Sequence, residues 1–170
     1  NRAGEHYSLS RTTSSSSITV IWDTIEEAGI TDPKQQAYIL ATAQWESNMG
    51  VYRTELWNPQ NPTEEQKNYD APGNKLGNIP GSGDGYRFRG RGYVHITGRA
   101  NYTKYGLQNN PELAADPKKA AHLLVYGMKD GAYTTNCLND YDYMLNGELY
   151  FDEARPIVNT NYAKAIGQIA

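Results

Sequence analysis

The stretch TDPKQQAYILATAQWESNMG, residues 31–50, carries the clearest helix start and stop signals in the chain. Asp32 can cap a helix with its side chain, and Pro33 suits the first helical position that follows. The inward-facing positions that recur at helical spacing are Gln36, Ile39, Leu40 and Ala43. Asn48-Met49-Gly50 then ends the pattern with a glycine. These signals predict a helix from Pro33 to about Ser47.

Helical patterns also occur on both sides of this stretch. One face of an amphipathic helix is formed by Ile18, Ile21, Trp22, Ile25 and Ala28, and Gly29 follows as a stop. Further helices are expected at 98–105, 111–129, 139–145 and 152–169. The sequence therefore predicts a mainly α fold.

Three segments lack such patterns. Residues 1–17 have almost no apolar periodicity and end in four serines, so we expect a flexible N-terminal arm before a single domain over residues 18–170. Residues 57–85 hold four of the eight prolines, which predicts a long loop with at most one helical turn near 63–69. Residues 86–96 predict an extended segment or short strand, which gives the fold a small irregular or β region.

The composition excludes several classes of protein. The 16 Lys and Arg residues are outnumbered by 19 Asp and Glu residues, and a net charge of −3 gives no general attraction to nucleic acid. The apolar runs are too short to span a bilayer, so we expect no membrane insertion. Cys137 is the only cysteine, which rules out internal disulfides. The three histidines lack metal-ligand spacing, so we expect no metal and no cofactor.

Two glutamates stand close together around the end of the helix predicted at 33–47. Glu46 lies in its last turn beside Trp45, where burial and the negative end of the helix dipole favour the neutral acid. Glu55 lies on the following loop near Arg53 and should stay ionised. Glycoside hydrolysis needs such a pair, with one carboxyl to donate a proton and one to activate water. Nineteen acidic residues also make chance pairs certain, so two solvated glutamates remain the alternative.

The stretch GYRFRGRGYVHITGRANY, residues 85–102, interleaves four arginines with aromatic residues. This pattern occurs in nucleic-acid-binding proteins, but the acidic balance of the chain and the lack of a second basic cluster argue against that function. The other interpretation is that Gly90 and Gly92 let the backbone approach another element closely. Polar side chains at 95, 97 and 101 would then reach into a cleft.

The same stretch contains Gly-Arg-Gly-x-x-x-x-Thr-Gly-Arg-Ala-Asn-Tyr at 90–102, and an Ala-x-x-Glu-Ser helix end precedes it at 43–47. Together these motifs resemble the family 19 glycoside hydrolases, which are chitinase-like enzymes. The resemblance is to the compact bacterial and phage branch, which contains endolysins and small chitinases. NPELAADP at 110–117 and EARPIVN at 153–159 are also typical of that branch, so the resemblance covers residues 18–169.

This resemblance implies a lysozyme-like helical domain with a substrate cleft. It implies inverting hydrolysis of β-1,4 bonds in polymers of N-acetylglucosamine, with degradation of cell-wall peptidoglycan favoured over chitin. The family's general acid falls on Glu46 and its second carboxylate on Glu55. The family's cleft positions fall on His95, Thr97, Asn101 and Asn159. The carboxyl groups of inverting enzymes are roughly 6.5–9.5 Å apart.

Aromatic residues add candidates for sugar stacking, among them Tyr93 and Trp57, for which packing in the core is an equal alternative. The partner that we expect is a polysaccharide, bound by a monomer. The resemblance places the protein outside the cell or has it delivered by a phage to the cell wall.

The sequence departs from the family's pattern at several positions. Trp45 stands where the family usually has His, Asn48-Met49 where it has Gly-Gly, and His95 where Gln is common. Asn159 is followed by Thr160-Asn161 instead of the usual glycines. The charge of His95 would change near neutral pH. A second hypothesis is therefore a glycan-binding protein on the same fold that has lost catalysis.

Overall fold

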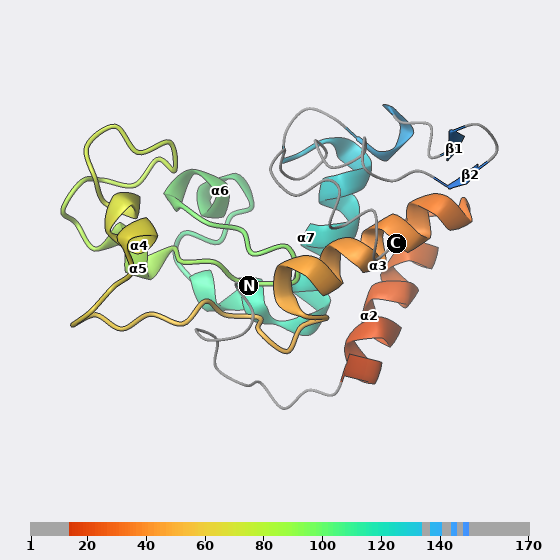
Figure 1. Ribbon diagram of the computed structural model, residues 1–170, viewed down its shortest axis with the longest axis horizontal. Helices are drawn as coiled ribbons and strands as arrows, with labels where there is room; N and C mark the ends of the chain where they lie inside the picture. Colours follow the sequence, from red (N-terminus) through yellow and green to blue (C-terminus); the bar gives the residue numbers. More distant parts are fainter. Residues whose placement is uncertain (1–13, 134–136, 141–143, 146–147, 150–170) are drawn as a thin grey trace.

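The computed structural model describes residues 14–133, 137–140, 144–145 and 148–149, and these residues form a mainly helical protein (Figure 1). The elements in chain order are α2 (Ser14–Glu27), α3 (Pro33–Ser47), α4 (Glu64–Tyr69), α5 (Asp84–Arg87), α6 (Arg99–Lys104), η1 (Pro111–Ala115), α7 (Pro117–Asp130), η2 (Leu138–Asp140), β1 (Met144–Leu145) and β2 (Glu148–Leu149). The prediction of a mainly α fold is confirmed. None of the helices in the described ranges is both long and apolar enough to cross a bilayer.

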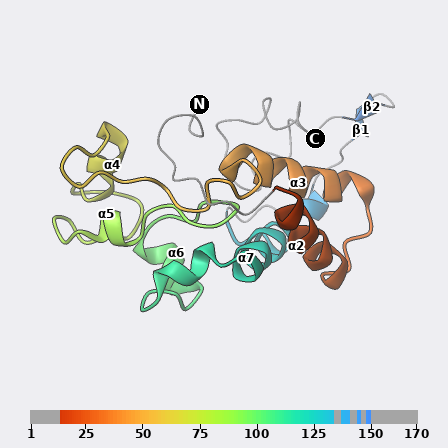
Figure 2. The same ribbon diagram turned by 90° about the horizontal axis from the view of Figure 1, so that it is seen from below.

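The described residues divide into two regions that lie side by side. The helical region consists of α2, α3 and α7, and the loop region consists of residues 51–110 with the short helices α4, α5 and α6. Figures 1 and 2 show the helical region at one end of the molecule and α4 and α5 at the other. The C-terminal end of α3 points toward the loop region. Helix α3 therefore ends on the side of the helical region that faces the loop region.

Helix α3 begins and ends as its sequence predicts. Asp32 Oδ1 accepts a hydrogen bond from Lys34 N at 2.9 Å, and Pro33 occupies the first turn. The expected inward side chains are buried at Ile39 and Ala43 and half-buried at Gln36 and Leu40. The helix ends at Asn48, whose φ of 50° is left-handed and whose N–H bonds the carbonyls of the last turn.

Helix α2 starts four residues earlier than the sequence indicated. Residues 14–17 form its first turn, although they were expected to belong to an arm, and residues 1–13 lie outside the described range. Ser17 is 1% exposed because it faces Gly50 and Tyr93: a Cβ at Gly50 would lie 2.7 Å from Ser17 Oγ and 2.5 Å from the Tyr93 ring. Position 50 therefore has no room for a side chain beside Ser17 and Tyr93.

The side chains that α2 buries are not all the ones that the sequence pattern predicted. Ile21 and Ile25 are fully buried, whereas Ile18 is 43% and Trp22 is 37% exposed. The expectation that Ile18 and Trp22 face the core was wrong, because the buried stripe runs through residues 17, 21, 24, 25 and 28. The Trp22 indole instead donates to Glu26 on the solvent side.

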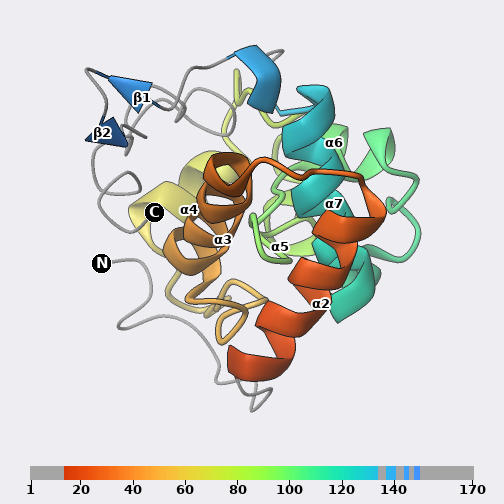
Figure 3. The same ribbon diagram turned by 90° about the vertical axis from the view of Figure 1, so that its right-hand side faces the viewer.

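Helix α7 packs against α2 and completes the core, and Figure 3 shows the two helices next to each other. Its buried face includes Leu124, Val125 and Met128. The helix predicted at 111–129 is split in two, because Asp116 caps a new helix at Pro117 through Lys119 N. Downstream, the helix predicted at 139–145 is replaced by η2 and β1, and β1 pairs antiparallel with β2. The helix predicted at 152–169 lies outside the described residues.

The loop region is held by polar contacts. Asp84 is 3% exposed, and its carboxylate binds the Arg99 guanidinium through two hydrogen bonds of 2.6 and 2.7 Å. The Oδ2 atom of Asp84, which accepts the 2.6 Å bond from Arg99 Nε, also accepts from Ile79 N at 2.9 Å. These bonds join the long loop after α4 to the start of α6. The extended segment expected at 86–96 reduces to isolated bridges that pair Arg91 with Thr54 and with Ile96.

Candidate active site

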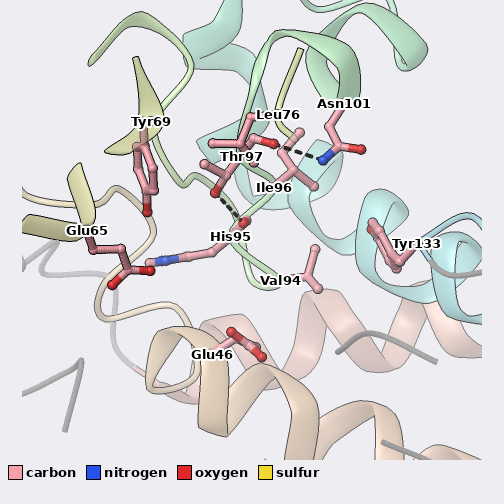
Figure 4. Close-up of a pocket in the computed structure, with 10 residues that line it drawn as sticks. All are labelled: Glu46, Glu65, Tyr69, Leu76, Val94, His95, Ile96, Thr97, Asn101 and Tyr133. Atoms are coloured by element: carbon pink, nitrogen blue, oxygen red, sulfur yellow. Dashed lines mark hydrogen bonds between the residues drawn. The ribbon is translucent and has the colours of Figure 1, made fainter. Parts of the chain in front are cut away.

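A cavity of about 290 Å³ lies between the end of α3 and the loop region. Glu46 lines it from α3, and His95, Thr97 and Asn101 line it from the opposite side (Figure 4). These four side chains were singled out from sequence, where about 50 positions separate Glu46 from the other three. The structure brings all four to one cavity.

Glu46 is half-buried in the last turn of α3. The chain reverses directly after it, with φ values of 50° at Asn48, 51° at Met49 and 82° at Gly50. Left-handed φ is unfavourable for residues other than glycine, and asparagine tolerates it better than methionine. The Ser47 hydroxyl stabilises this turn, since it donates to Ala43 O and accepts from Gly50 N. The strained turn thus begins two residues after Glu46, which lines the cavity from the end of α3.

Glu55 is not among the residues that line the cavity; it lies next to the lining residue Tyr69, and three donors fix its carboxylate. Gly90 N–H donates to Oε2 at 2.9 Å, and Gln66 Nε2 donates to Oε1 at 3.1 Å. A longer contact of 3.4 Å joins Oε1 to the hydroxyl of Tyr69, which lines the cavity. The Glu55 N–H also donates to Gly90 O, so the two residues are bonded in both directions. The carboxylate of Glu55 therefore has a defined orientation.

His95 connects the cavity to the loop after α3. Its backbone is left-handed, with φ of 52°, and its Nε2 bonds the carbonyl of Tyr52 at 2.5 Å. A carbonyl only accepts hydrogen bonds, so Nε2 carries a proton. The Thr97 hydroxyl donates to His95 O, and Asn101 Nδ2 donates to Thr97 O. This chain of bonds sets the position of all three side chains along the cavity.

The cavity is also lined by Glu65, which sequence reasoning missed, and by Tyr69, which was one of the aromatic candidates for sugar stacking. Glu65 of α4 is exposed, and Figure 4 shows its carboxylate and the His95 ring pointing toward one another. Tyr69, at the end of the same helix, touches Glu55 through its hydroxyl. Thr63-x-x-Gln66 is a capping-box signature that predicts where α4 begins, and hence that Glu65 and Tyr69 share a helix.

The arginines of residues 87–99 are largely committed to the fold. Arg91 is 3% exposed and donates through Nη1 to Arg87 O and to the Tyr102 hydroxyl. Arg89 stacks over the Tyr86 ring at 4.2 Å, and Arg99 binds Asp84. Burial and the neighbouring charge of Arg91 lower the pKa of Arg89, whereas Glu55 raises it. Arg89 and Glu55 are thus close enough to interact electrostatically.

Three predicted substrate-binding residues fall elsewhere. Tyr93 is 0% exposed between α2 and Gly50, so the expectation that it stacks on a sugar was wrong: its ring fills the core. Trp57 is half-buried and lines a separate groove of about 550 Å³, with the rings of Tyr69 and Tyr86 each 5.9 Å from its own. Asn159 lies outside the described residues.

No group of three or more His, Cys, Asp or Glu side chains that could hold a metal ion occurs within the described ranges. The chain matches no protein-family model and no curated protein sequence.

Proposed function

We propose that this protein is a glycoside hydrolase that cleaves β-1,4 bonds in N-acetylglucosamine-containing polymers, with peptidoglycan favoured over chitin. The observation that carries the proposal is that Glu46 lines a cavity together with Tyr69, whose hydroxyl contacts the carboxylate of Glu55. The resemblance of residues 43–47 and 90–102 to the family 19 enzymes supports it. A lysozyme-like domain with a substrate cleft, a monomer and a place of action at the cell wall belong to the same proposal.

In the proposed reaction Glu46 is the general acid. Its proton passes to the glycosidic oxygen as the bond from that oxygen to the anomeric carbon breaks. A water molecule attacks the opposite face of the same carbon, and Glu55 accepts the proton that this water loses. The products are two shorter chains, one with an inverted anomeric centre, and proton exchange with solvent restores both carboxyl groups.

The other side chains of the cavity have supporting roles in this scheme. Thr97 and Asn101 offer hydroxyl and amide groups at hydrogen-bonding positions for sugar hydroxyl or acetamido groups. Tyr69 presents an aromatic ring and a hydroxyl on the side of the cavity nearest Glu55. These groups orient the sugar between the two carboxyls. Holding the reacting groups in the correct orientation supplies a large part of the rate enhancement of an enzyme.

The experiment is the substitution Glu46→Gln, assayed by loss of turbidity of purified bacterial cell walls and by cleavage of chitin oligomers. Loss of a general acid lowers the rate by roughly a hundredfold to ten-thousandfold, while the folded structure is retained. The matched control is Glu27→Gln, which changes an exposed glutamate at the end of α2. Equal activity of Glu46→Gln and the wild type would contradict the proposal. Proton NMR of the first product should show the α-anomer.

A glycan-binding protein without catalysis is the second candidate, and one observation favours it. The Nε2 atom of His95 is used for the bond to Tyr52 O, and His95, Asn48 and Met49 all have left-handed backbones. These are three of the positions at which the sequence departs from the family's pattern. Mass spectrometry after long incubation with cell walls separates the candidates, because any released oligosaccharide excludes a pure binding protein.

A further inference from the structure

Gln66 is a buried amide at the start of α4, and both ends of its side chain are hydrogen-bonded. The residue is 5% exposed. Its Oε1 accepts from Thr63 N at 3.0 Å, while its Nε2 donates to Glu55 Oε1 at 3.1 Å and to Leu56 O at 2.8 Å. The acceptor role of Oε1 fixes which end of the amide faces Glu55. The Gln66 side chain therefore links the helix cap to the carboxylate of Glu55.

The helix cap alone does not require an amide at this position. In a capping box the third helical residue needs only a side-chain oxygen that accepts from the N-cap backbone, and glutamate serves as well as glutamine. A glutamate, however, has no N–H to donate to Glu55 and Leu56. What distinguishes glutamine from glutamate at position 66 is thus the contact with Glu55.

The surroundings of Glu55 make this contact sensitive to charge. The groups that face its carboxylate are the Gly90 N–H, the Tyr69 hydroxyl and the Gln66 amide, with Arg89 acting over a longer distance. His95 Nδ1 also lies close, since it and Glu55 Oε2 would be 3.2 and 3.3 Å from a Cβ at Gly90. Tyr102 interacts with Glu55 electrostatically as well, and Glu65 lines the cavity beyond Tyr69.

We propose that Gln66 is a positioning residue for Glu55: its amide N–H holds the carboxylate in the orientation that receives a proton from the attacking water. The inference rests on the proposed function, because only a carboxylate that acts as a base gains from this orientation. Gln66 itself does not line the cavity and acts through its hydrogen bond to Glu55. A neutral donor in this place stabilises the charged carboxylate, whereas a second carboxylate would repel it.

The decisive variant is Gln66→Glu. It keeps the acceptor of the capping box, so the melting temperature should change by only a few degrees, while a negative charge replaces the donor. Repulsion between Glu55 and the introduced carboxylate makes the pair take up a proton at higher pH, so the acid limb of the kcat/KM profile should move up by about one pH unit or more. The matched control is Gln60→Glu, which adds the same charge at an exposed position of the loop before α4. This variant should leave the pH profile of kcat/KM unchanged.

A second pair of variants separates positioning of Glu55 from helix capping. Gln66→Met removes both the donor to Glu55 and the acceptor of the capping box without adding charge, and it should lower kcat by roughly tenfold to a hundredfold, with KM much less affected. Thr63→Ala removes the cap of α4 but no contact of Glu55, so it should lower the melting temperature and leave kcat unchanged. An equal loss of kcat in Thr63→Ala and Gln66→Met would overturn the proposal. If Gln66→Glu does not fold, the comparison of Gln66→Met with Thr63→Ala decides whether Gln66 positions Glu55.

The titration of the carboxyl of residue 55, followed by carbon-13 NMR in the full chain without substrate, distinguishes the two proposals. Suppose that the wild type never releases sugar, but that the titration of residue 55 moves to higher pH in Gln66→Glu. This result would support the contact between the two side chains and refute the glycosidase function. If the wild type is active, and if folded Gln66→Glu has the same titration and the same pH profile as the wild type, only the positioning role is refuted.

Discussion

The helical region and the loop region are stabilised by different kinds of contact. In the helical region the fully buried side chains are mainly aliphatic, as at Ile21, Ile25 and Leu124. In the loop region much of the order comes from hydrogen bonds and an ion pair, such as Asp84 with Arg99. Hydrophobic packing is non-directional, whereas hydrogen bonds fix distances and angles. Stability should therefore depend most on the first region and the geometry of the site most on the second.

The largest effect on stability is expected at the core of the helical region. Leu124→Ala removes a fully buried side chain from α7 and leaves a cavity, which should lower the free energy of unfolding by about 3 kcal/mol. Chemical denaturation followed by circular dichroism measures this loss. The control is Leu113→Ala in η1, where the side chain is 51% exposed and little change is expected. Similar losses in both variants would contradict the comparison.

A smaller effect, specific to the loop region, is expected at acidic pH. The hydrogen bonds from the Arg99 guanidinium hold the pKa of Asp84 below its ordinary value of 3.8. The unfolded chain consequently binds a proton at Asp84 at a pH where the folded chain does not. The stability that this pair contributes is present above about pH 4 and is lost as the pH falls through the folded pKa.

Hydrogen exchange at residues 70–110 between pH 3 and pH 6 measures this loss. The variant Asp84→Asn should be less stable than the wild type near neutral pH and should show a flatter dependence on pH. Asp23→Asn, an exposed change on α2, provides the control and should keep the dependence of the wild type. A steep acid dependence that persists in Asp84→Asn would show that another group is responsible.

The smallest effect is expected at the turn where the two regions meet. Asn48 has a left-handed backbone, and Asn48→Gly should change the free energy of unfolding by only about 0.5 kcal/mol, because the relief of strain offsets the lost bond from Gln44. Asn48→Ala loses the same bond without that relief and should be destabilised by about 1 kcal/mol. Thermal unfolding of both variants measures the difference, and equal melting temperatures would contradict the role of backbone strain.

The helical region was the more predictable of the two. The capping and stop signals of α3 gave its boundaries, because these signals are local and use the residue types that helix ends require. The buried face of α2 was harder to predict, because a large apolar residue such as Trp22 fits either the middle of that face or its partly exposed edge. Tyr93 was assigned to the cleft for a similar reason: a tyrosine ring suits a sugar platform and a core equally well.

The candidate site was predictable where it depends on a motif and not where it depends on tertiary contacts. Glu46, His95, Thr97 and Asn101 follow from two short motifs, and all four line the cavity. The contact of Gln66 with Glu55 joins residues of different elements, and no local pattern around either residue predicts it. The orientation of the Glu55 carboxylate also depends on Gly90, 35 positions further along the chain.

The cluster of Trp57, Tyr69 and Tyr86 gives this molecule an optical probe. The indole lies 5.9 Å from each of the two phenol rings, and Tyr69 in turn touches Glu55. Excitation energy absorbed by either tyrosine will reach Trp57 efficiently over such a short separation. Trp22 and Trp45 also emit, so a variant in which both are replaced by phenylalanine isolates the emission of Trp57, and a saccharide that displaces Tyr69 would change the intensity of that emission.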